Sequence, residues 1–350
     1  MGQYNWVYNI GYDHDVRIRE GLYQPGGVAM TTEETPTTPF EQVLAELQDE
    51  SQPFSPKHLR AFSDMDNGSL EKLKHAWADV PLKRKINLLE DLEELMEADT
   101  LVCCDALAKY AMTDADAGVR RHAINLLWEC EDSSLIPAFM NTLDNDPEES
   151  VRAAAAAALG KFILLGELDE IDQEKADPII ERLLAIMQQQ EDGDIPRRAL
   201  ESLGFSSHKA VTGLIEKAMH SKDSRWIASA LFAMGRSLDE RWEKIVLQHL
   251  NDEETAVQIE AVRAAGELEL SSALETLFEL LDDDDADADL LVQIYWALSK
   301  IGGKGVREKL EQELEDAVDE NLMDILDMAL ENLEFTEDSD DLDLFDIEPD

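Results

Sequence analysis

Arginine and aromatic residues recur in the second half of a chain that is otherwise dominated by carboxylates. The candidates for a binding site are Arg197, Arg263, Phe232, Tyr295 and Trp296. A guanidinium group holds a carboxylate through two parallel hydrogen bonds, and an aromatic ring supplies rigid contact area. Together these groups are suited to the capture of an acidic or aromatic peptide. We therefore predict that they contact a partner protein.

The motifs of common catalytic and cofactor-binding sites are missing from the sequence. It contains no glycine-rich phosphate loop, no His-Glu-x-x-His and no Gly-x-Ser-x-Gly. The acidic run from Asp282 to Asp289 lacks the glycine and the terminal glutamate of an EF-hand loop. Cys103 and Cys104 are adjacent and Cys130 stands alone, which fits neither a disulfide framework nor a metal site. We expect no catalytic residue, no cofactor and no metal.

The elements that must position the candidate residues form an internal repeat. The repeat is marked by five glycines: Gly160, Gly204, Gly235, Gly266 and Gly303. Each stands nine positions after a β-branched or aromatic residue, which is Val151, Ile195, Trp226, Val257 and Ile294, respectively. The intervals from 204 to 235 and from 235 to 266 are both 31 residues. Units of this length stack so that neighbours bury each other's apolar faces. The sequence thus predicts a solenoid, which binds along an extended surface.

Each repeat is expected to contain two helices. Val257, Ala261 and Ala265 fall at helical spacing before Gly266, which we interpret as a C-cap because glycine enters the left-handed region freely. A second apolar stripe covers residues 274–281 and ends in an acidic turn. No segment alternates with period two over the length of a strand. The predicted fold class is therefore all-α, an α-solenoid of about six or seven stacked helical hairpins.

One repeat is longer than the others. The interval between Gly160 and Gly204 exceeds the 31-residue period by 13 residues, and the excess falls within residues 162–177. Insertions in a solenoid usually map to one face, often the binding face. The alternative is a longer loop between helices that packs its own leucines.

Two segments resemble a known repeat family. Residues 146–160 read Asp-Pro-Glu-Glu-Ser-Val-Arg-Ala-Ala-Ala-Ala-Ala-Ala-Leu-Gly, and residues 116–128 follow the same pattern with tryptophan in place of the glycine. They are similar to HEAT-like repeats of the type found in phycobilisome lyases, in which an acidic turn precedes Val-Arg-x-x-Ala-x-x-Ala-Leu-Gly. In such arrays this helix lines the concave side, so the resemblance places the candidate residues in a concave groove. It also implies that Arg120 and Arg152 pair with an acidic turn residue of an adjacent repeat.

The resemblance is compatible with more than one function. HEAT-like hydroxylases hold iron through His-Glu dipeptides, but no histidine of this chain precedes a glutamate. We expect a non-enzymatic scaffold or adaptor that binds a partner protein through the concave face, the acidic surface or the tail. The alternative is a bilin-lyase-like enzyme or an enzyme-accessory subunit.

The chain is strongly acidic. With 78 Asp and Glu against 30 Lys and Arg, its formal net charge is −48. This charge repels phosphate backbones and anionic lipids, so we expect neither direct nucleic-acid binding nor membrane binding. A basic protein, or one that carries a basic segment, is the expected partner. The acidity is also consistent with solubility alone or with adaptation to a salty cytoplasm. The lack of a long apolar run and of a disulfide framework leads us to expect a cytoplasmic protein.

Changes of composition divide the chain. Residues 1–30 are rich in tyrosine, asparagine and glycine, and we expect either translation from Met30 or a disordered extension. Residues 31–69 are expected to be a polar linker with short helices, and residues 70–113 one or more degenerate repeats. The HEAT-like solenoid with a C-terminal capping helix is assigned to residues 114–333, and an acidic disordered tail to residues 334–350.

The tail contains three further candidates for partner binding, Leu342, Leu344 and Phe345. The segment from Asp341 to Phe345 resembles the Gln-Leu-Ser/Asp-Leu-Phe peptide by which bacterial replication and repair proteins bind the sliding clamp. It departs from that peptide at its first position, where aspartate replaces glutamine. A tail that only increases solubility is the alternative.

Overall fold

The computed structural model describes residues 39–189, 193–283 and 286–343, and within these ranges the only regular elements are helices. This confirms the predicted all-α solenoid. The chain divides into two compact units, residues 1–158 and 159–350, with the boundary inside helix α7. We describe each unit by itself.

Unit 1 consists of helices joined by short turns. In order they are α1 (Phe40–Gln48), the 3₁₀ helix η1 (Pro56–Phe62), α2 (Asn67–Trp77), α3 (Leu82–Ala98), α4 (Asp105–Ala111), α5 (Ala117–Asn125), η2 (Ser133–Leu135), α6 (Ile136–Asn145) and the first half of α7 (Glu149–Glu167). Helices α3 and α4 both pack against α5, and α1 packs against α2. The sequence predicts a polar linker with short helices over residues 31–69, and its described part holds α1, η1 and the start of α2. Their Leu47 and Phe62 are fully buried, so this segment is part of the packed unit.

Unit 2 continues the same architecture with a longer series of stacked pairs. After α7 it contains α8 (Gln173–Gln188), α9 (Asp194–Leu203), α10 (Val211–Met219), α11 (Ser224–Arg236), η3 (Glu240–Trp242), α12 (Glu243–His249), α13 (Thr255–Glu267), η4 (Ser271–Ala273), α14 (Leu274–Leu281), α15 (Ala288–Ile301), α16 (Val306–Asp316) and α17 (Glu320–Asp343). Helix α17 runs ten residues beyond residue 333, the predicted end of the solenoid.

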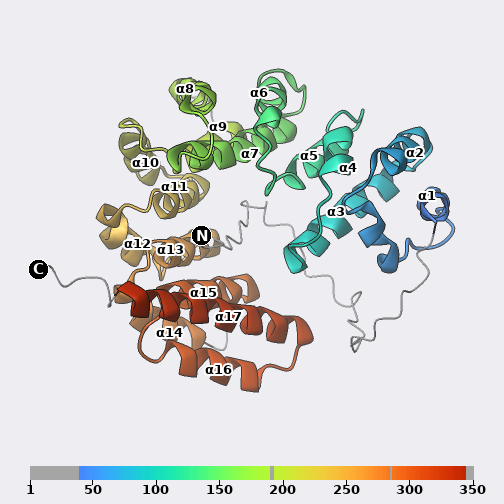
Figure 1. Ribbon diagram of the computed structural model, residues 1–350. Helices are drawn as coiled ribbons and strands as arrows, with labels where there is room; N and C mark the ends of the chain where they lie inside the picture. The colour runs from blue at the N-terminus through green and yellow to red at the C-terminus, as the bar shows by residue number, and fades with distance from the viewer. Residues whose placement is uncertain (1–38, 190–192, 284–285, 344–350) are drawn as a thin grey trace, which may run out of the picture. The chain divides into compact units, whose positions relative to one another are not determined.

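The helices of unit 2 form two layers. Helices α9, α11, α13 and α15 stack side by side as the inner layer, and α8, α10, α12 and α14 each pack against one of them from the outside (Figure 1). Helix α17 closes the series by packing against both α15 and α16. Each inner helix therefore turns one face toward its outer partner and the opposite face inward.

Acidic turn residues cap the start of several helices. Asp116 accepts hydrogen bonds from the backbone N–H groups of Gly118 and Val119 at the start of α5. Asp223 accepts one from the N–H of Arg225 at the start of α11. A carboxylate at this position satisfies N–H groups that have no partner inside the helix and interacts favourably with the helix dipole.

The recurring glycines have a different role from the one predicted. Gly266 lies inside α13, so its interpretation as a left-handed C-cap is wrong. Gly160 and Gly235 also lie inside helices, and Gly204 has right-handed helical angles. Of the five recurring glycines, Gly303 alone has a positive φ, of +95°. A Cβ on Gly266 would lie 2.7 Å from Ala297 Cα, and one on Gly204 2.8 Å from Ala233 Cα. Glycine is required because the backbone of the next inner helix approaches this closely.

The 13-residue excess lengthens helices. Helix α7 has 19 residues and α8 has 16, against 13 and 7 for α11 and α12. The excess of the long repeat therefore extends the hairpin itself and adds no long loop.

Candidate functional site

Nine residues form three rows across the inner layer of unit 2, and we call them the inner-face grid. Each row has one residue on or just after α9, one on α11 and one on α13, and successive residues of a row are 31 positions apart. The first row is Arg198, Ser229 and Glu260, the second is Glu201, Phe232 and Arg263, and the third is Phe205, Arg236 and Glu267. Each helix thus contributes side chains that are one and two turns apart and that share one side of the helix.

Helical periodicity decides which way the grid faces. On α9 the apolar Ala199, Leu200 and Leu203 are fully buried in the core shared with the outer helices. Arg198 and Glu201 lie three residues apart on the other side of the same helix, and an ion pair of 2.7 Å joins them. The grid therefore occupies the inward side of the layer.

The α9 end of the grid is held by hydrogen bonds between helices. The Ser229 hydroxyl donates to Glu201 Oε1 at 2.6 Å and accepts from Arg197 Nη1 at 3.3 Å. Arg197 also pairs with Asp194 on its own helix. Arg197 and Arg198 are therefore each already paired with a carboxylate of α9.

Phe232 is the centre of the grid. The guanidinium carbon of Arg236 lies 4.8 Å from the centroid of its ring, and that of Arg263 lies 5.8 Å from it. Arg236 also lies 5.1 Å from the centroid of Phe205. Such cation–π contacts are worth about 0.5–2 kcal/mol each, more when they are desolvated. They hold the arginines in fixed positions on the inward side.

The α13 end of the grid continues to α15. Arg263 Nε lies 3.0 Å from Glu260 Oε2, and Lys300 Nζ of α15 lies 2.8 Å from Glu267 Oε1. Positive, aromatic and negative groups thus alternate from α9 to α15. Over the grid itself, three arginines face three glutamates.

Burial and neighbouring charges set the protonation of the glutamates. Burial raises the pKa of Glu260, and the nearby Glu201 acts in the same direction, against the arginines around it. Burial alone would also raise the pKa of Glu267, but Lys300 and Arg236 outweigh it and hold that pKa below its ordinary value. The grid therefore contains one carboxyl whose pKa is raised and another whose pKa is lowered.

The structure brings some of the predicted site residues together and separates others. Phe232 and Arg263 belong to the grid, and Arg197 adjoins it through Ser229. Tyr295 is only 1% exposed and donates from its hydroxyl to Glu313 of α16 at 3.3 Å. Its predicted partner contact is wrong, because it points into the core between α15 and α16. Trp296 lies next to it on α15 and is half-buried.

Most of the grid was missed as a site by sequence reasoning. Arg198, Glu201, Arg236 and Glu267 are charged residues among many, and only their 31-residue spacing from other polar or aromatic residues marks them. The predicted tail contacts Leu344 and Phe345 lie outside the described residues. Leu342 is in the last turn of α17, and its side chain is likewise outside the description.

In unit 1, the arginines after the valine stabilise turns. Arg120 makes two 2.8 Å hydrogen bonds to the carboxylate of Asp146, in the turn before the next inner helix. Arg152 donates to the backbone carbonyls of Asp146 and Pro147, at 2.6 and 3.1 Å. Arg120 therefore links two repeats, whereas Arg152 braces the turn that precedes its own helix.

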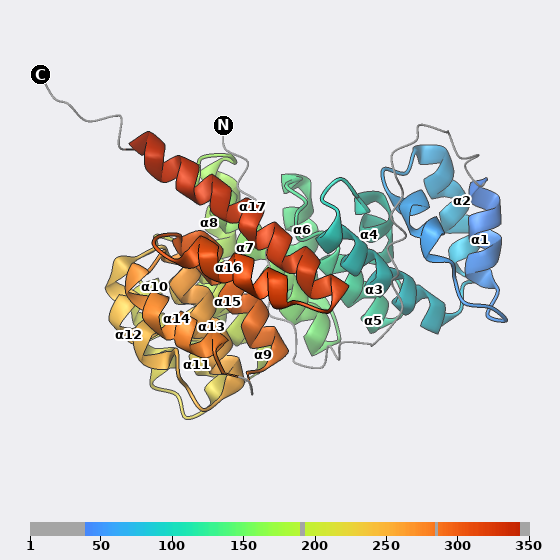
Figure 2. The same ribbon diagram turned by 90° about the horizontal axis from the view of Figure 1, so that it is seen from below.

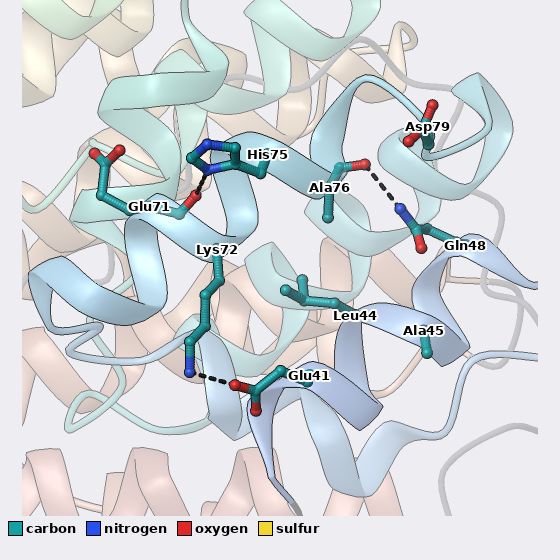
Figure 3. Close-up of a pocket in the computed structure, with 9 residues that line it drawn as sticks. All are labelled: Glu41, Leu44, Ala45, Gln48, Glu71, Lys72, His75, Ala76 and Asp79. Carbon is teal, nitrogen blue, oxygen red and sulfur yellow. Dashed lines mark hydrogen bonds and ion pairs between the residues drawn. The ribbon is translucent and has the colours of Figure 1, made fainter.

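A shallow groove of about 530 Å³ lies between α1 and α2 (Figure 3). An ion pair between Lys72 and Glu41 crosses one end, and a 3.1 Å hydrogen bond from Gln48 Nε2 to the carbonyl of Ala76 crosses the other. Leu44 lies between these two links. Because Lys72, Glu41 and Gln48 are already engaged within the groove, it is a weaker candidate than the grid.

Membrane-spanning helices and metal-binding clusters are both absent from the described part of the chain. None of its helices combines the length and the apolar character that crossing a bilayer requires. In the same ranges, no three or more His, Cys, Asp or Glu side chains are grouped so that they could hold a metal ion.

Stacked helical pairs with a polar inner face define the class of protein, an α-solenoid built of repeats. Its family follows from comparison: the HEAT repeat model matches residues 104–179 and 243–331. The chain is a HEAT-like repeat protein. The match is to HEAT repeats in general, so the phycobilisome-lyase type remains a prediction. No curated protein matches the sequence.

Solved structures with related folds are distant. The Escherichia coli YibA protein is 16% identical, with a TM-score of 0.40 over 82% of this chain and 98% of that chain. Human deoxyhypusine hydroxylase in complex with glycerol is 16% identical, with a TM-score of 0.33 over 75% and 95%. An engineered protein is 15% identical, with a TM-score of 0.33 over 85% and 99%.

Proposed function

We propose that this chain is a non-enzymatic scaffold that binds a segment of a partner protein along the inner-face grid of unit 2. The observation that carries the proposal is the grid itself, in which guanidinium groups, phenyl rings and carboxylates alternate over three helices. Burying ion pairs contributes little net stability compared with apolar packing. A HEAT-like inner layer could therefore be stabilised by leucine or alanine at these positions, and specificity is the better explanation for the charges.

The grid suits an extended segment that crosses the helices. Packed helices lie about 8–10 Å apart, so such a segment would meet a new group of the grid every three residues or so. Phe205 and Arg263, which are half-buried, would contact the segment directly, and the buried Phe232 and Arg236 would hold them in position. Rings and arginines of this kind dominate the binding energy of protein interfaces.

The test removes one ion pair as a unit. Glu260→Gln combined with Arg263→Gln leaves the net charge of the chain unchanged and leaves neither partner as an isolated charge. The matched control, Glu71→Gln with Lys74→Gln, removes an exposed pair within α2. Proteins captured by the three forms from the source organism would be quantified by mass spectrometry, and the leading one purified for titration.

We expect the partner to bind the wild type and the control equally and the grid variant at least about tenfold more weakly. Equal affinity for all three forms would refute the proposal. Visible absorption of the purified protein tests the alternative of a bilin-lyase-like enzyme or accessory subunit, because a bound pigment would colour it and a scaffold would be colourless.

A further inference from the structure

The last helix of unit 2 has two different faces. On one side Leu326, Ala329 and Leu333 are fully buried against α15 and α16. Thr336 adds a 2.9 Å hydrogen bond from its hydroxyl to the carbonyl of Ser299. Figure 2 shows α17 lying across these two helices. The helix is therefore firmly attached along one side, and its other side has no described helix of this unit packed upon it.

The outer side carries a continuous row of carboxylates, which we call the acidic stripe. Its members alternate at intervals of four and three residues and are all exposed: Glu320, Asp324, Asp327, Glu331 and Glu334. Helix α17 contains no lysine or arginine. Arg307 of α16 lies beside the end of the stripe: its Nη1 is 3.8 Å from Glu334, and its Nε donates a 3.2 Å hydrogen bond to Glu337 of α17.

This charge pattern is unfavourable for the helix alone. Like charges three or four residues apart destabilise a helix by about 0.2–0.5 kcal/mol per pair. The stripe contains four such neighbouring pairs. A ligand that places cations along it would relieve this repulsion and gain ion pairs.

Apolar side chains lie beside the stripe. Met328 is 39% exposed and Phe335 is 72% exposed, and they are seven residues apart on the helix. A cap that served solubility alone would need only polar groups on its outer side. An apolar row flanked by one sign of charge is the pattern that an amphipathic helix of the opposite charge matches.

We propose that the outer side of α17 binds a basic amphipathic helix of a partner protein. The apolar row of that helix packs on Met328 and Phe335, and its lysines or arginines lie along the acidic stripe. This site is separate from the inner-face grid and does not depend on the function proposed for it.

The test uses a model peptide of about three heptads, with leucine at positions a and d and lysine at e and g so that it does not self-associate. A scrambled peptide of the same composition has the same charge but no apolar row. Both would be titrated into the full chain by calorimetry. We expect the amphipathic peptide to bind at least about tenfold more tightly than the scrambled one.

Two sets of variants locate the site. Replacing the five stripe carboxylates by their amides should abolish the preference, and so should Met328→Ser with Phe335→Ser, which leaves the charge intact. The matched control replaces five exposed glutamates elsewhere in unit 2: Glu216, Glu240, Glu253, Glu275 and Glu279. It removes the same charge and should keep the preference.

The proposal is overturned if the two peptides bind the wild type equally, since binding then reflects net charge alone. It is also overturned if the stripe variant and the control lose affinity to the same extent. Far-ultraviolet circular dichroism verifies that each variant keeps its helix content, so a loss of binding cannot arise from unfolding.

Discussion

The close contact between α13 and α15 gives the most direct test of the packing. Gly266→Ala adds one methyl group where a Cβ would lie 2.7 Å from Ala297 Cα and 3.1 Å from Ala297 Cβ. Carbon atoms pack at about 3.5–4.0 Å. Because the obstructing atom is backbone, no rotamer change relieves the contact, and α15 must move away from α13 along its length.

Two opposing terms set the size of the effect. Alanine is about 1 kcal/mol more favourable than glycine inside a helix. Overpacking a tightly packed core costs about 1–3 kcal/mol, and a clash with backbone falls at the upper end of that range. We therefore expect Gly266→Ala to lower the free energy of unfolding by about 1–2 kcal/mol.

Gly213 supplies the matched control. It lies in helix α10, and a Cβ there would have no neighbour within 4 Å. Gly213→Ala should raise stability by about 0.5–1 kcal/mol through helix propensity alone. Urea unfolding followed by far-ultraviolet circular dichroism compares both variants with the wild type. The packing argument fails if Gly266→Ala is as stable as the wild type or more stable.

Three further predictions use the same unfolding assay. Ala261→Leu should cost about 1–3 kcal/mol because Ala261 is fully buried, whereas Ala286→Leu, in an acidic turn, should change stability little; equal effects would contradict the assignment of the core. Burial alone would raise the pKa of Asp146, but the hydrogen bonds from Arg120 and the Glu148 N–H, with the charges of Arg120 and Arg152, together lower it. The resulting stability is present above the ordinary value of 3.8 and is lost as the pH falls below it. Asp146→Asn should therefore flatten the acid loss of stability, and an unchanged pH profile would exclude this role. Burial raises the pKa of Glu260, so its contribution is fully present at low pH and is lost as the pH rises. Glu260→Gln should accordingly gain stability relative to the wild type as the pH rises above the ordinary value of 4.5, and a gain only toward acid would reverse the argument.

The sequence predicts the fold class and the repeat well, because both depend on local patterns. Apolar residues at helical spacing and acidic turns specify where helices start, as the capping by Asp116 and Asp223 illustrates. The role of Gly266 could not be derived in this way. A helical glycine and a C-cap glycine look alike in sequence, and the difference depends on Ala297, 31 residues further on.

The candidate site was predicted only in part, for a related reason. Arginine and aromatic types led to Arg263 and Phe232, which the structure brings together. Tyr295 has the same chemistry, but the side of α15 on which it lies points into the core. Arg236 escaped notice because its contacts with Phe205 and Phe232 join neighbouring repeats. A comparison of the charged residues that stand 31 positions apart would have identified Arg236.

The glycine contacts also determine how unit 2 can bend. Backbone meets backbone across the inner layer at Gly204, Gly235 and Gly266, so little compressible side-chain material separates these helices. The outer helices have no such contact among the glycine positions, since Gly213 on α10 faces open space. Elastic bending should then pivot about the inner layer and appear as opening and closing of the outer one. A ligand on the inner side would experience a nearly constant spacing of its contacts while the curvature of the unit fluctuates.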